Sequence, residues 1–477
     1  MFNIRKHIRV LGSALAGAAL YSQLAHAQTA ESTAVPPPST PEAPAGSQAS
    51  AEGAVNASPP AVVDQMGQLS SAATPTIAGA TADVDISAYA METAAAAATD
   101  EGPSLSLYGF ADFSVISVFG DEYPGKVAIG ENPAFMLGNL NLYAAARLSE
   151  RWRSLLEVRF TVFPDGNIDY GTLQRVSTAS HDYANISTTT RWGGIVIERA
   201  WLEYSVHELL TIRAGSFLTP VGIWNVDHGS PTIIPALRPF IIGNALFPLK
   251  QTGFEVYGNR LFGSTTLGYH LTVSNGRGGI ETYGDLDKNK ALGGRLYATF
   301  TPLGTLTIGA SGYTGRSTSG GVKVVAGKPS LGVTEQFDEL ALGADLLWKW
   351  QGLHVQAELQ SAQVRYTPAG GAPPLLGGPP TGVVSDHARL GGYALLAYRL
   401  PWLPLMPFAE LEFLHNGGQE KSLPGAPNKV YSYGGGLNYR PIPSVTLKAQ
   451  YYHTRMLQPG GAQFDFDTIY CQSAWSF

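Results

Sequence analysis

Arginines recur at alternate positions of extended stretches in the body of the chain. Arg159, Arg199, Arg213 and Arg295 each share one face of a predicted strand with polar neighbours. A guanidinium stays charged and carries five hydrogen-bond donors, so a row of them along a water-filled space favours the passage of anions. Arg147 has the same register, but it lies next to a short turn, and we assign it a structural role.

Carboxylates occupy the same face of later predicted strands, at Asp345, Glu358, Glu410 and Glu412. Because neighbouring strands are also neighbours on a barrel wall, we expect this acidic quarter to face the arginine-rich quarter across the lumen. Charges placed in this way would set a transverse field that orients dipolar or charged solutes.

A structural alternative remains open for the arginines. Inward charges of a barrel can simply pair with their neighbours, as Arg159 with Glu157 or Arg199 with Glu203. Solvated pairs of this kind contribute little energy and select no solute.

The connection at 219–249 is richer in Val, Ile, Leu and Phe than a loop in bulk water. The inside of a barrel is the nearest place that would bury these side chains. We therefore predict that this third long loop folds into the lumen and narrows it, with Asp227, His228 and Arg238 near the constriction. A loop packed over the rim or against a neighbouring subunit is the alternative. One adjacent Asp-His pair is a weak sign of a metal or catalytic site, and we predict neither.

The elements that position these residues are strands, because apolar and polar residues alternate with a period of two. Val445, Leu447 and Ala449, for example, alternate with Thr446 and Lys448. The pattern predicts about sixteen strands, near 105–119, 135–148, 152–163, 193–206, 209–218, 250–258, 261–273, 290–300, 304–314, 337–350, 352–366, 386–399, 405–415, 429–440, 443–455 and 464–477.

The connections alternate between short and long, as they do in an outer-membrane barrel with short periplasmic turns and long outer loops. The even strand count places both termini in the periplasm. Aromatic residues stand beside the short turns, where a girdle at the lipid headgroups belongs, and the chain ends on Phe477, as bacterial outer-membrane barrels do. The soluble alternative is a β-sandwich or propeller. We predict an all-β, transmembrane antiparallel barrel. The aromatic residues of the girdle are Trp152, Trp350, Trp402 and Tyr439.

Amino-acid composition indicates the nature of the two segments that precede the barrel. Residues 1–27 have a basic start, an apolar stretch and a small-x-small cleavage site, which is typical of a secretory signal peptide. Residues 28–103 are rich in Ala and Pro and carry nine acids without Lys or Arg, which predicts a disordered acidic linker. Residues 104–477 are formally neutral, which argues against nucleic-acid binding. A single cysteine excludes an internal disulfide.

Short segments resemble known porins. The stretches 212–222 (IRAGSFLTPVG) and 251–258 (QTGFEVYG) are similar to segments of phosphate-selective-porin-like proteins, and 107–112 (LYGFAD) resembles the first strand of Gram-negative porins. The resemblance covers roughly 104–477. It implies a sixteen-stranded barrel, usually trimeric, with the third loop in the lumen. Phosphate-selective members rely on many pore arginines and lysines, whereas this chain has a neutral body and a mixed wall.

We therefore expect an outer-membrane porin that lets small hydrophilic solutes diffuse, with a mild preference for anions and without a cofactor or metal. Its expected partners are outer-membrane lipid, those solutes and two further copies of the chain. One rival is a barrel hydrolase, although the histidines show no pattern with a Ser nucleophile or an Asp. The other is a structural tether, in which 28–103 hold the outer membrane to an inner layer.

Overall fold

The structure, a computed structural model, describes residues 102–120, 132–164, 167–168, 176–177, 190–226, 228–277, 285–302, 304–325, 328–367, 386–417, 428–458 and 460–477. The predicted signal peptide, nearly all of the predicted linker and Asp227 lie outside these residues. Among the described residues, no helix has the length and apolar character needed to cross a membrane.

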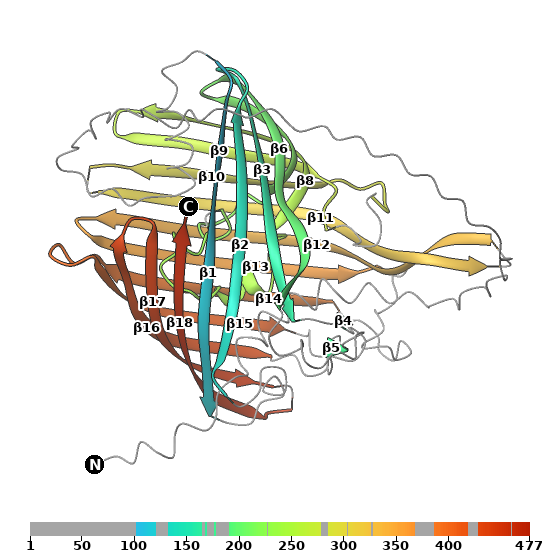
Figure 1. The fold of residues 1–477 in the computed structure, drawn as a ribbon. Coiled ribbons are helices and arrows are strands. Elements are labelled where there is room, and N and C mark those ends of the chain that lie inside the picture. The colour runs from blue at the N-terminus through green and yellow to red at the C-terminus, as the bar shows by residue number, and fades with distance from the viewer. Residues whose placement is uncertain are drawn as a thin grey trace, which may run out of the picture. The chain divides into compact units, whose positions relative to one another are not determined.

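Within the described residues, sixteen antiparallel strands close into a barrel, and β1 pairs with β18 to complete it (Figure 1). Their bounds are β1 Ser104–Gly120, β2 Ala134–Arg147, β3 Trp152–Pro164, β6 Thr190–His207, β7 Leu210–Leu218, β8 Lys250–Phe262, β9 Thr265–Ser274, β10 Ala291–Phe300, β11 Thr305–Val325, β12 Lys328–Trp350, β13 Leu353–Tyr366, β14 His387–Tyr398, β15 Leu405–Gly417, β16 Lys429–Ile442, β17 Val445–Leu457 and β18 Gln463–Ser476. A separate pair, β4 (Asn167–Ile168) and β5 (Val176–Ser177), and the short helix α5 (Phe240–Gly243) complete the described elements. The predicted fold class and strand count are confirmed.

Two predicted connections are wrong. The turn expected near 258–260 lies at Gly263 and Ser264 instead, because β8 keeps pairing with β9 as far as Phe262. The long loop expected between residues 314 and 337 is mostly hairpin, because β11 and β12 stay paired out to Val325 and Lys328. The sequence did not predict this extension because residues 317–321 are Ser, Thr and Gly, which show no alternation of apolar and polar side chains.

The two faces of the sheet have opposite polarity, as the alternation predicts. On β17, Leu447 is 40 % exposed on the outer face, whereas its neighbours Thr446 and Lys448 are 1 and 3 % exposed inside. A soluble protein buries the apolar set and exposes the polar one. The inverted arrangement is what a barrel surrounded by hydrocarbon requires.

Exposed aromatic side chains accompany the short connections, which supports the predicted girdle. Trp152, Trp350, Trp402 and Tyr439 all have exposed side chains, and each lies at or beside the connection expected from the sequence. The C-terminal Phe477 continues the ladder, because its backbone N–H and C=O both pair with Gly109 of β1.

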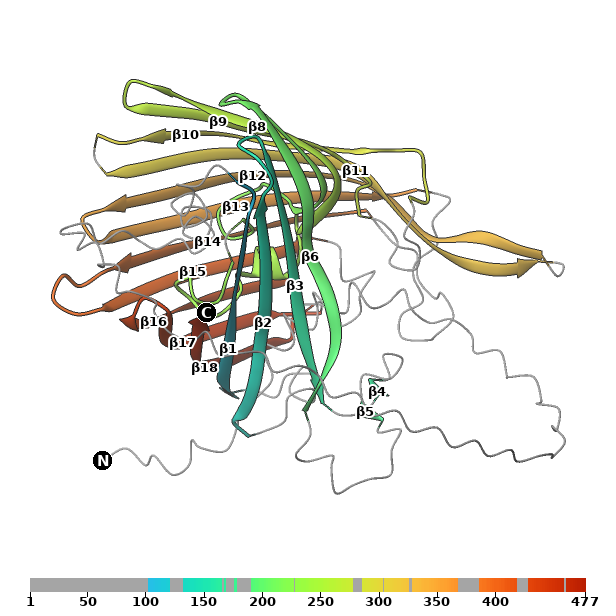
Figure 2. The same ribbon diagram turned by 45° about the horizontal axis from the view of Figure 1, so that its top comes forward.

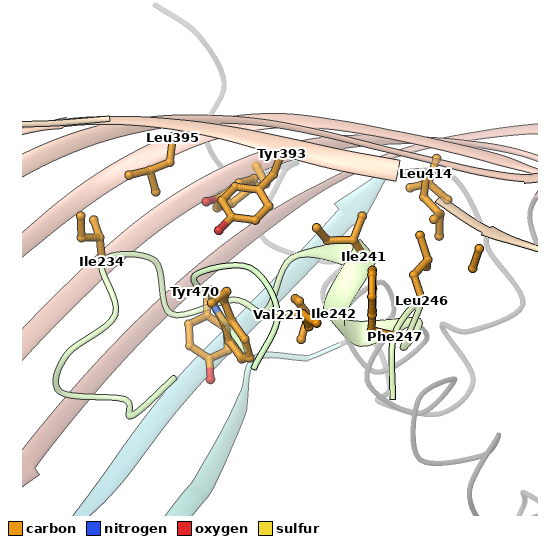
Figure 3. Close-up of a cluster of buried hydrophobic side chains, with 14 of the residues drawn as sticks. Val221, Ile234, Ile241, Ile242, Leu246, Phe247, Tyr393, Leu395, Leu414 and Tyr470 are labelled. Atoms are coloured by element: carbon orange, nitrogen blue, oxygen red, sulfur yellow. The ribbon is translucent and has the colours of Figure 1, made fainter. Parts of the chain in front are cut away.

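The third loop, 219–249, folds into the barrel, as its apolar composition predicts. Its side chains form one buried cluster with side chains of the inner wall. Figure 3 shows Val221, Ile241 and Leu246 of the loop on the side of Tyr393 and Leu414, which come from β14 and β15. Seen from a second direction, the loop and α5 again lie inside the ring of strands (Figure 2).

Candidate channel constriction

The loop begins and ends at one place, where its two ends are bonded together. The backbone N–H of Thr219 donates to the carbonyl of Leu249 at 3.0 Å. The side-chain amide of Asn225 donates to the carbonyls of both residues, at 2.8 and 3.0 Å. Gln251, the second residue of β8, donates to the hydroxyl of Thr219. These bonds turn 219–249 into a closed lobe with a fixed base.

Carboxylates of the inner wall accept hydrogen bonds from the backbone of the loop. Oε1 of Glu358 on β13 accepts from the N–H groups of Ile223 and Trp224, at 3.0 and 2.8 Å. Glu412 on β15 accepts from the N–H of Phe240, the first residue of α5, at 2.8 Å. A short loop segment in an irregular conformation leaves such donors unpaired, and the wall supplies the acceptors.

Cations, an amide and a hydroxyl also bind the loop, through its carbonyl oxygens. Nζ of Lys448 on β17 donates to the carbonyl of Ser230 at 2.7 Å. The further donors to loop carbonyls are Arg277, Arg389, Asn438, Arg440 and Thr446. The loop is therefore attached mainly to the strands from β13 to β17. Arg277, which follows β9, and Asp112 of β1, which accepts from the Ser230 hydroxyl, hold it as well.

This attachment corrects the sequence-based expectation for the acidic quarter. Glu358, Glu410 and Glu412 do lie on the inner wall, but they are buried beneath the loop and its apolar cluster. Asp345 does not face the arginines across the lumen either. It lies beside Arg295 and accepts from that guanidinium at 3.0 and 2.6 Å. The alternation of side chains predicts the face correctly, but it cannot tell that a loop covers that face.

The opposite half of the wall carries a ladder of ion pairs, which we call the arginine ladder. Each of the four arginines predicted on the wall has a carboxylate partner. The pairs are Arg159 with Glu198 at 2.9 Å, Arg199 with Glu157 at 2.5 Å, Arg213 with Glu203 at 2.8 Å and with Glu255 at 2.6 Å, and Arg295 with Asp345 at 2.6 Å. The structural alternative of lateral pairing thus holds for all four arginines, although with partners other than those expected.

The two signs of charge in the ladder lie at different depths. The side chains of Arg159, Arg199 and Arg213 are 18 to 25 % exposed, whereas those of their glutamate partners are 0 to 7 % exposed. A solute inside the barrel would therefore meet guanidinium N–H groups first. The carboxylates are less exposed, so the guanidinium groups make up most of the exposed charge of these three arginines and their partners.

Sequence reasoning missed Glu198 and its second partner Lys250, which bond at 2.9 Å. Arg199 pairs with Glu157 across the sheet, and Ile197 pairs with Val158, so Glu198 is the extra residue of a β-bulge. A bulge shifts the alternation by one residue, which turns Glu198 inward beside Arg199. The sequence contains no clear signal for it.

On the loop, Trp224, His228 and Arg238 form a stacked group. The rings of Trp224 and His228 lie 5.2 Å apart and nearly parallel, and the guanidinium of Arg238 lies 5.3 Å from the Trp224 ring centre. Burial, and to a lesser degree the positive charge of Arg238, lowers the pKa of His228 to about 4. His228 is therefore neutral at physiological pH, and its Nδ1 lies 3.1 Å from the carbonyl of Asn225.

The loop group and the first part of the arginine ladder influence each other. The charges of Arg159 and Glu198 act on Arg238, and those of Glu157 and Arg199 act on His228. Among the predicted residues, Arg238 thus lies within the electrostatic range of Arg159, and His228 within that of Arg199. Arg213 and Arg295 lie further along the wall. Among the described residues, no three His, Cys, Asp or Glu side chains could hold a metal ion together.

The fold defines the structural class of the protein. Within the described residues, it is a closed sixteen-stranded antiparallel β-barrel whose third loop folds inward. No protein-family profile matches the chain, and no curated protein matches its sequence.

Outer-membrane porins are among the structural neighbours. A loop L8 deletion mutant of OmpT, an outer membrane protein of Vibrio cholerae, has a TM-score of 0.49 and 11% identity over 79% of this chain and 100% of that one. The outer membrane channel DcaP of Acinetobacter baumannii has a TM-score of 0.46 and 13% identity, over 80% and 99%. An anion-selective porin from Comamonas acidovorans has a TM-score of 0.45 and 12% identity, over 79% and 100%. Similarity this low carries no functional argument.

Proposed function

We propose that the chain is a passive diffusion channel of the bacterial outer membrane for small hydrophilic solutes, with a mild preference for anions. The observation that carries the proposal is the inverted polarity of the barrel. Exposed Leu447 and Tyr451 alternate on β17 with buried Thr446, Lys448 and Gln450. Such a wall is stable where hydrocarbon surrounds it and polar groups meet inside.

The lobe of the third loop supports the channel interpretation. It is bonded to β1 and β2 and to the strands from β13 to β17, whereas the arginine side chains of the ladder stay partly exposed. The charges at the start of that ladder act on His228 and Arg238 of the loop. Solutes would cross between these two surfaces.

The different depths of the two charge signs support the anion preference. Guanidinium groups at the surface of a narrow aqueous path lower the energy of anions there, even when each group has a buried counter-charge. The same pairing keeps the preference mild, because the net charge of the ladder is small. A strictly phosphate-selective pore would need more unpaired cations.

The proposal includes the remaining expectations from the sequence. The protein forms a homotrimer, is not an enzyme and has both termini in the periplasm, with 28–103 as a linker between the cleaved signal peptide and the barrel. Single-channel recording of the refolded protein in a planar bilayer tests the channel itself. A protein that is folded but gives no discrete conductance would contradict it.

Reversal potentials in a KCl gradient test the anion preference. We expect a modest chloride preference that decreases in Arg199→Gln, because this change removes a surface cation and leaves Glu157 behind. Arg455→Gln is the matched control, since Arg455 also pairs with a carboxylate, Asp465, but lies on the outward-facing register of β17. Strong cation selectivity of the wild type would refute the arginine contribution.

A further inference from the structure

A charged side chain interrupts the apolar outer face of the barrel on β18. Four strands that run in the same direction as β18 carry an exposed aromatic residue at the end with short connections and, eight positions earlier, an exposed apolar residue. These pairs are Phe262 and Phe254 on β8, Phe300 and Leu292 on β10, Trp350 and Leu342 on β12, and Tyr398 and Leu390 on β14. On β18 the exposed aromatic is Trp475, and the residue eight positions earlier is Asp467. At ~2.6 Å of height per residue in a strand tilted by about 40°, this position lies ~21 Å from the level of the aromatic residue, within an apolar band of about 25 Å.

Asp467 is the centre of a bonded group on the outer face of β16 to β18, which we call the outer polar patch: Tyr433, Tyr451, His453 and Asp467. Oδ1 of Asp467 lies 3.0 Å from Nδ1 of His453, the residue opposite it on β17, and accepts from the hydroxyl of Tyr451 at 2.6 Å. The ring of His453 packs against that of Tyr433 on β16, with ring centres 5.2 Å apart. The side chains of His453 and Asp467 are 24 and 26 % exposed. These contacts fix the patch and leave it open outward.

Neither hydrocarbon nor a lipid headgroup suits the outer polar patch. Ionisable side chains in membrane-spanning segments are rare toward lipid and usually face other protein. An anionic headgroup would meet the carboxylate of Asp467, which repels it. Tyr433 and Tyr451 are 56 and 46 % exposed. Tyrosine is enriched where proteins meet, because its ring covers apolar area and its hydroxyl forms hydrogen bonds. The patch therefore suits a protein surface.

Small outward residues lie beside the patch, toward the end with short connections. Gly435 of β16 lies two positions after Tyr433, and exposed Ala449 of β17 lies two positions before Tyr451. The exposed Cys471 of β18 is directly opposite Ala449. Side chains this small let the backbone of a second molecule approach closely. The patch and these residues form one continuous outer face.

We propose that copies of this chain bind one another through the outer face of β16 to β18. The inference rests on the proposed homotrimer and names its contact surface. Tyr451, His453 and Asp467 supply hydrogen-bond donors and acceptors together, so this face can bond to polar groups of a second copy. The faces of β8 to β14, with Leu342 and its equivalents, meet lipid instead.

The native cysteine reports whether this face is covered. In wild-type protein reconstituted into vesicles, we expect a lipid-soluble maleimide to label Cys471 slowly, because a second copy lies over it. The matched control combines Cys471→Ser with Leu342→Cys, which moves the thiol to a lipid-facing position. This control should be labelled fast.

Removing the polar groups tests what holds the copies together. His453→Leu combined with Asp467→Leu makes the patch apolar, which suits lipid and leaves the barrel intact on gels of unheated protein. Light scattering in mild detergent should show three copies for the wild type and one for this variant, and its Cys471 should be labelled as fast as the control. Arg455→Gln should stay a trimer, because its partner Asp465 lies two residues beyond Asp467, further from Trp475.

The outcomes separate this inference from the proposed function. Fast labelling of Cys471 in a wild-type trimer would show lipid on this face and overturn the inference, while the homotrimer would stand. A trimer that survives the two leucine substitutions would also overturn it. A wild-type protein that is a single barrel would overturn both the inference and the homotrimer, and chloride conductance through that single barrel would leave the channel intact.

Discussion

Glu358 offers the sharpest test of how the loop is held. Its Oε1 accepts hydrogen bonds from the N–H groups of Ile223 and Trp224 and from the hydroxyl of Tyr393. Glu358→Leu removes the acceptor for both loop N–H groups at a place where the carboxylate is only 3 % exposed, so little water can replace it. Each unpaired donor costs ~1–3 kcal/mol, so the docked state of this segment loses about 2–6 kcal/mol. Since ~1.4 kcal/mol is a factor of ten in an equilibrium, the ratio of docked to undocked loop falls at least about thirtyfold.

The matched control is Glu358→Gln. All three donors use the same oxygen of Glu358, so a glutamine oxygen there can replace it. The new amide NH₂ then takes the place of Oε2, which now accepts from Nε2 of Gln360 at 3.2 Å. Gln360 can turn its amide to accept instead, because its Oε1 is buried and has no hydrogen-bond partner among the described residues.

Single-channel recording distinguishes the two variants. Glu358→Leu should show a higher mean conductance and frequent steps between levels, because the loop no longer stays docked, whereas Glu358→Gln should match the wild type. Wild-type conductance in Glu358→Leu would refute the anchoring role. Equal disturbance in both variants would show that the charge matters, not the acceptor. A gel-mobility test of folded against heated protein confirms that each variant forms the barrel.

Three further expectations follow. Gly222→Ala should disturb the loop like Glu358→Leu, because Gly222 has a φ of +62° and a Cβ there would overlap the Glu358 carboxylate; unchanged conductance would contradict this. Arg213→Met removes the arginine that Glu203 and Glu255 share. Glu203 keeps Arg153 at 2.8 Å, but Glu255 is left without an arginine, so the change should cost about 3 kcal/mol, seen as a lower temperature for loss of the folded band on gels; an unchanged temperature would argue against it. His228, with its pKa lowered to about 4, stays neutral from pH 5 to 8, so wild type and His228→Gln should give the same selectivity profile over that range. The folded state disfavours protonated His228, so the contribution of neutral His228 to stability is lost as pH falls from about 6.5 to 4. A step in the selectivity of the wild type near pH 6 that is absent from His228→Gln would refute this assignment.

The faces of the strands could be predicted from the sequence, and the partners of the inward residues could not. Alternation places Arg199 and Glu358 inside, because a side-chain period of two is a property of any extended strand. It does not give the register of neighbouring strands when a bulge intervenes. Glu198 is the instance, since one extra residue in β6 turned it inward and made it the partner of Arg159.

The inward loop was predictable in kind, because its apolar residues had to be buried somewhere. Which wall it would cover was not predictable, since that depends on three-dimensional complementarity between loop carbonyls and donors such as Lys448. The acidic quarter was therefore placed on the correct face but given the wrong environment. Hairpin length was a further limit, because the glycines and serines at the tips of β11 and β12 pair without an apolar pattern.

Most of the side chains that hold the loop lie on other strands than those of the arginine ladder, and this separation gives the molecule two largely separate adjustments. Residues on β13 to β17, such as Glu358 and Lys448, determine how far the lobe protrudes into the barrel. They therefore determine the width of the channel. Residues on β3 to β10, such as Arg159 and Arg213, determine which charge the path prefers. Substitutions could therefore retune solute size without altering charge preference, or the reverse, and an engineer could vary one strand set while leaving the other untouched.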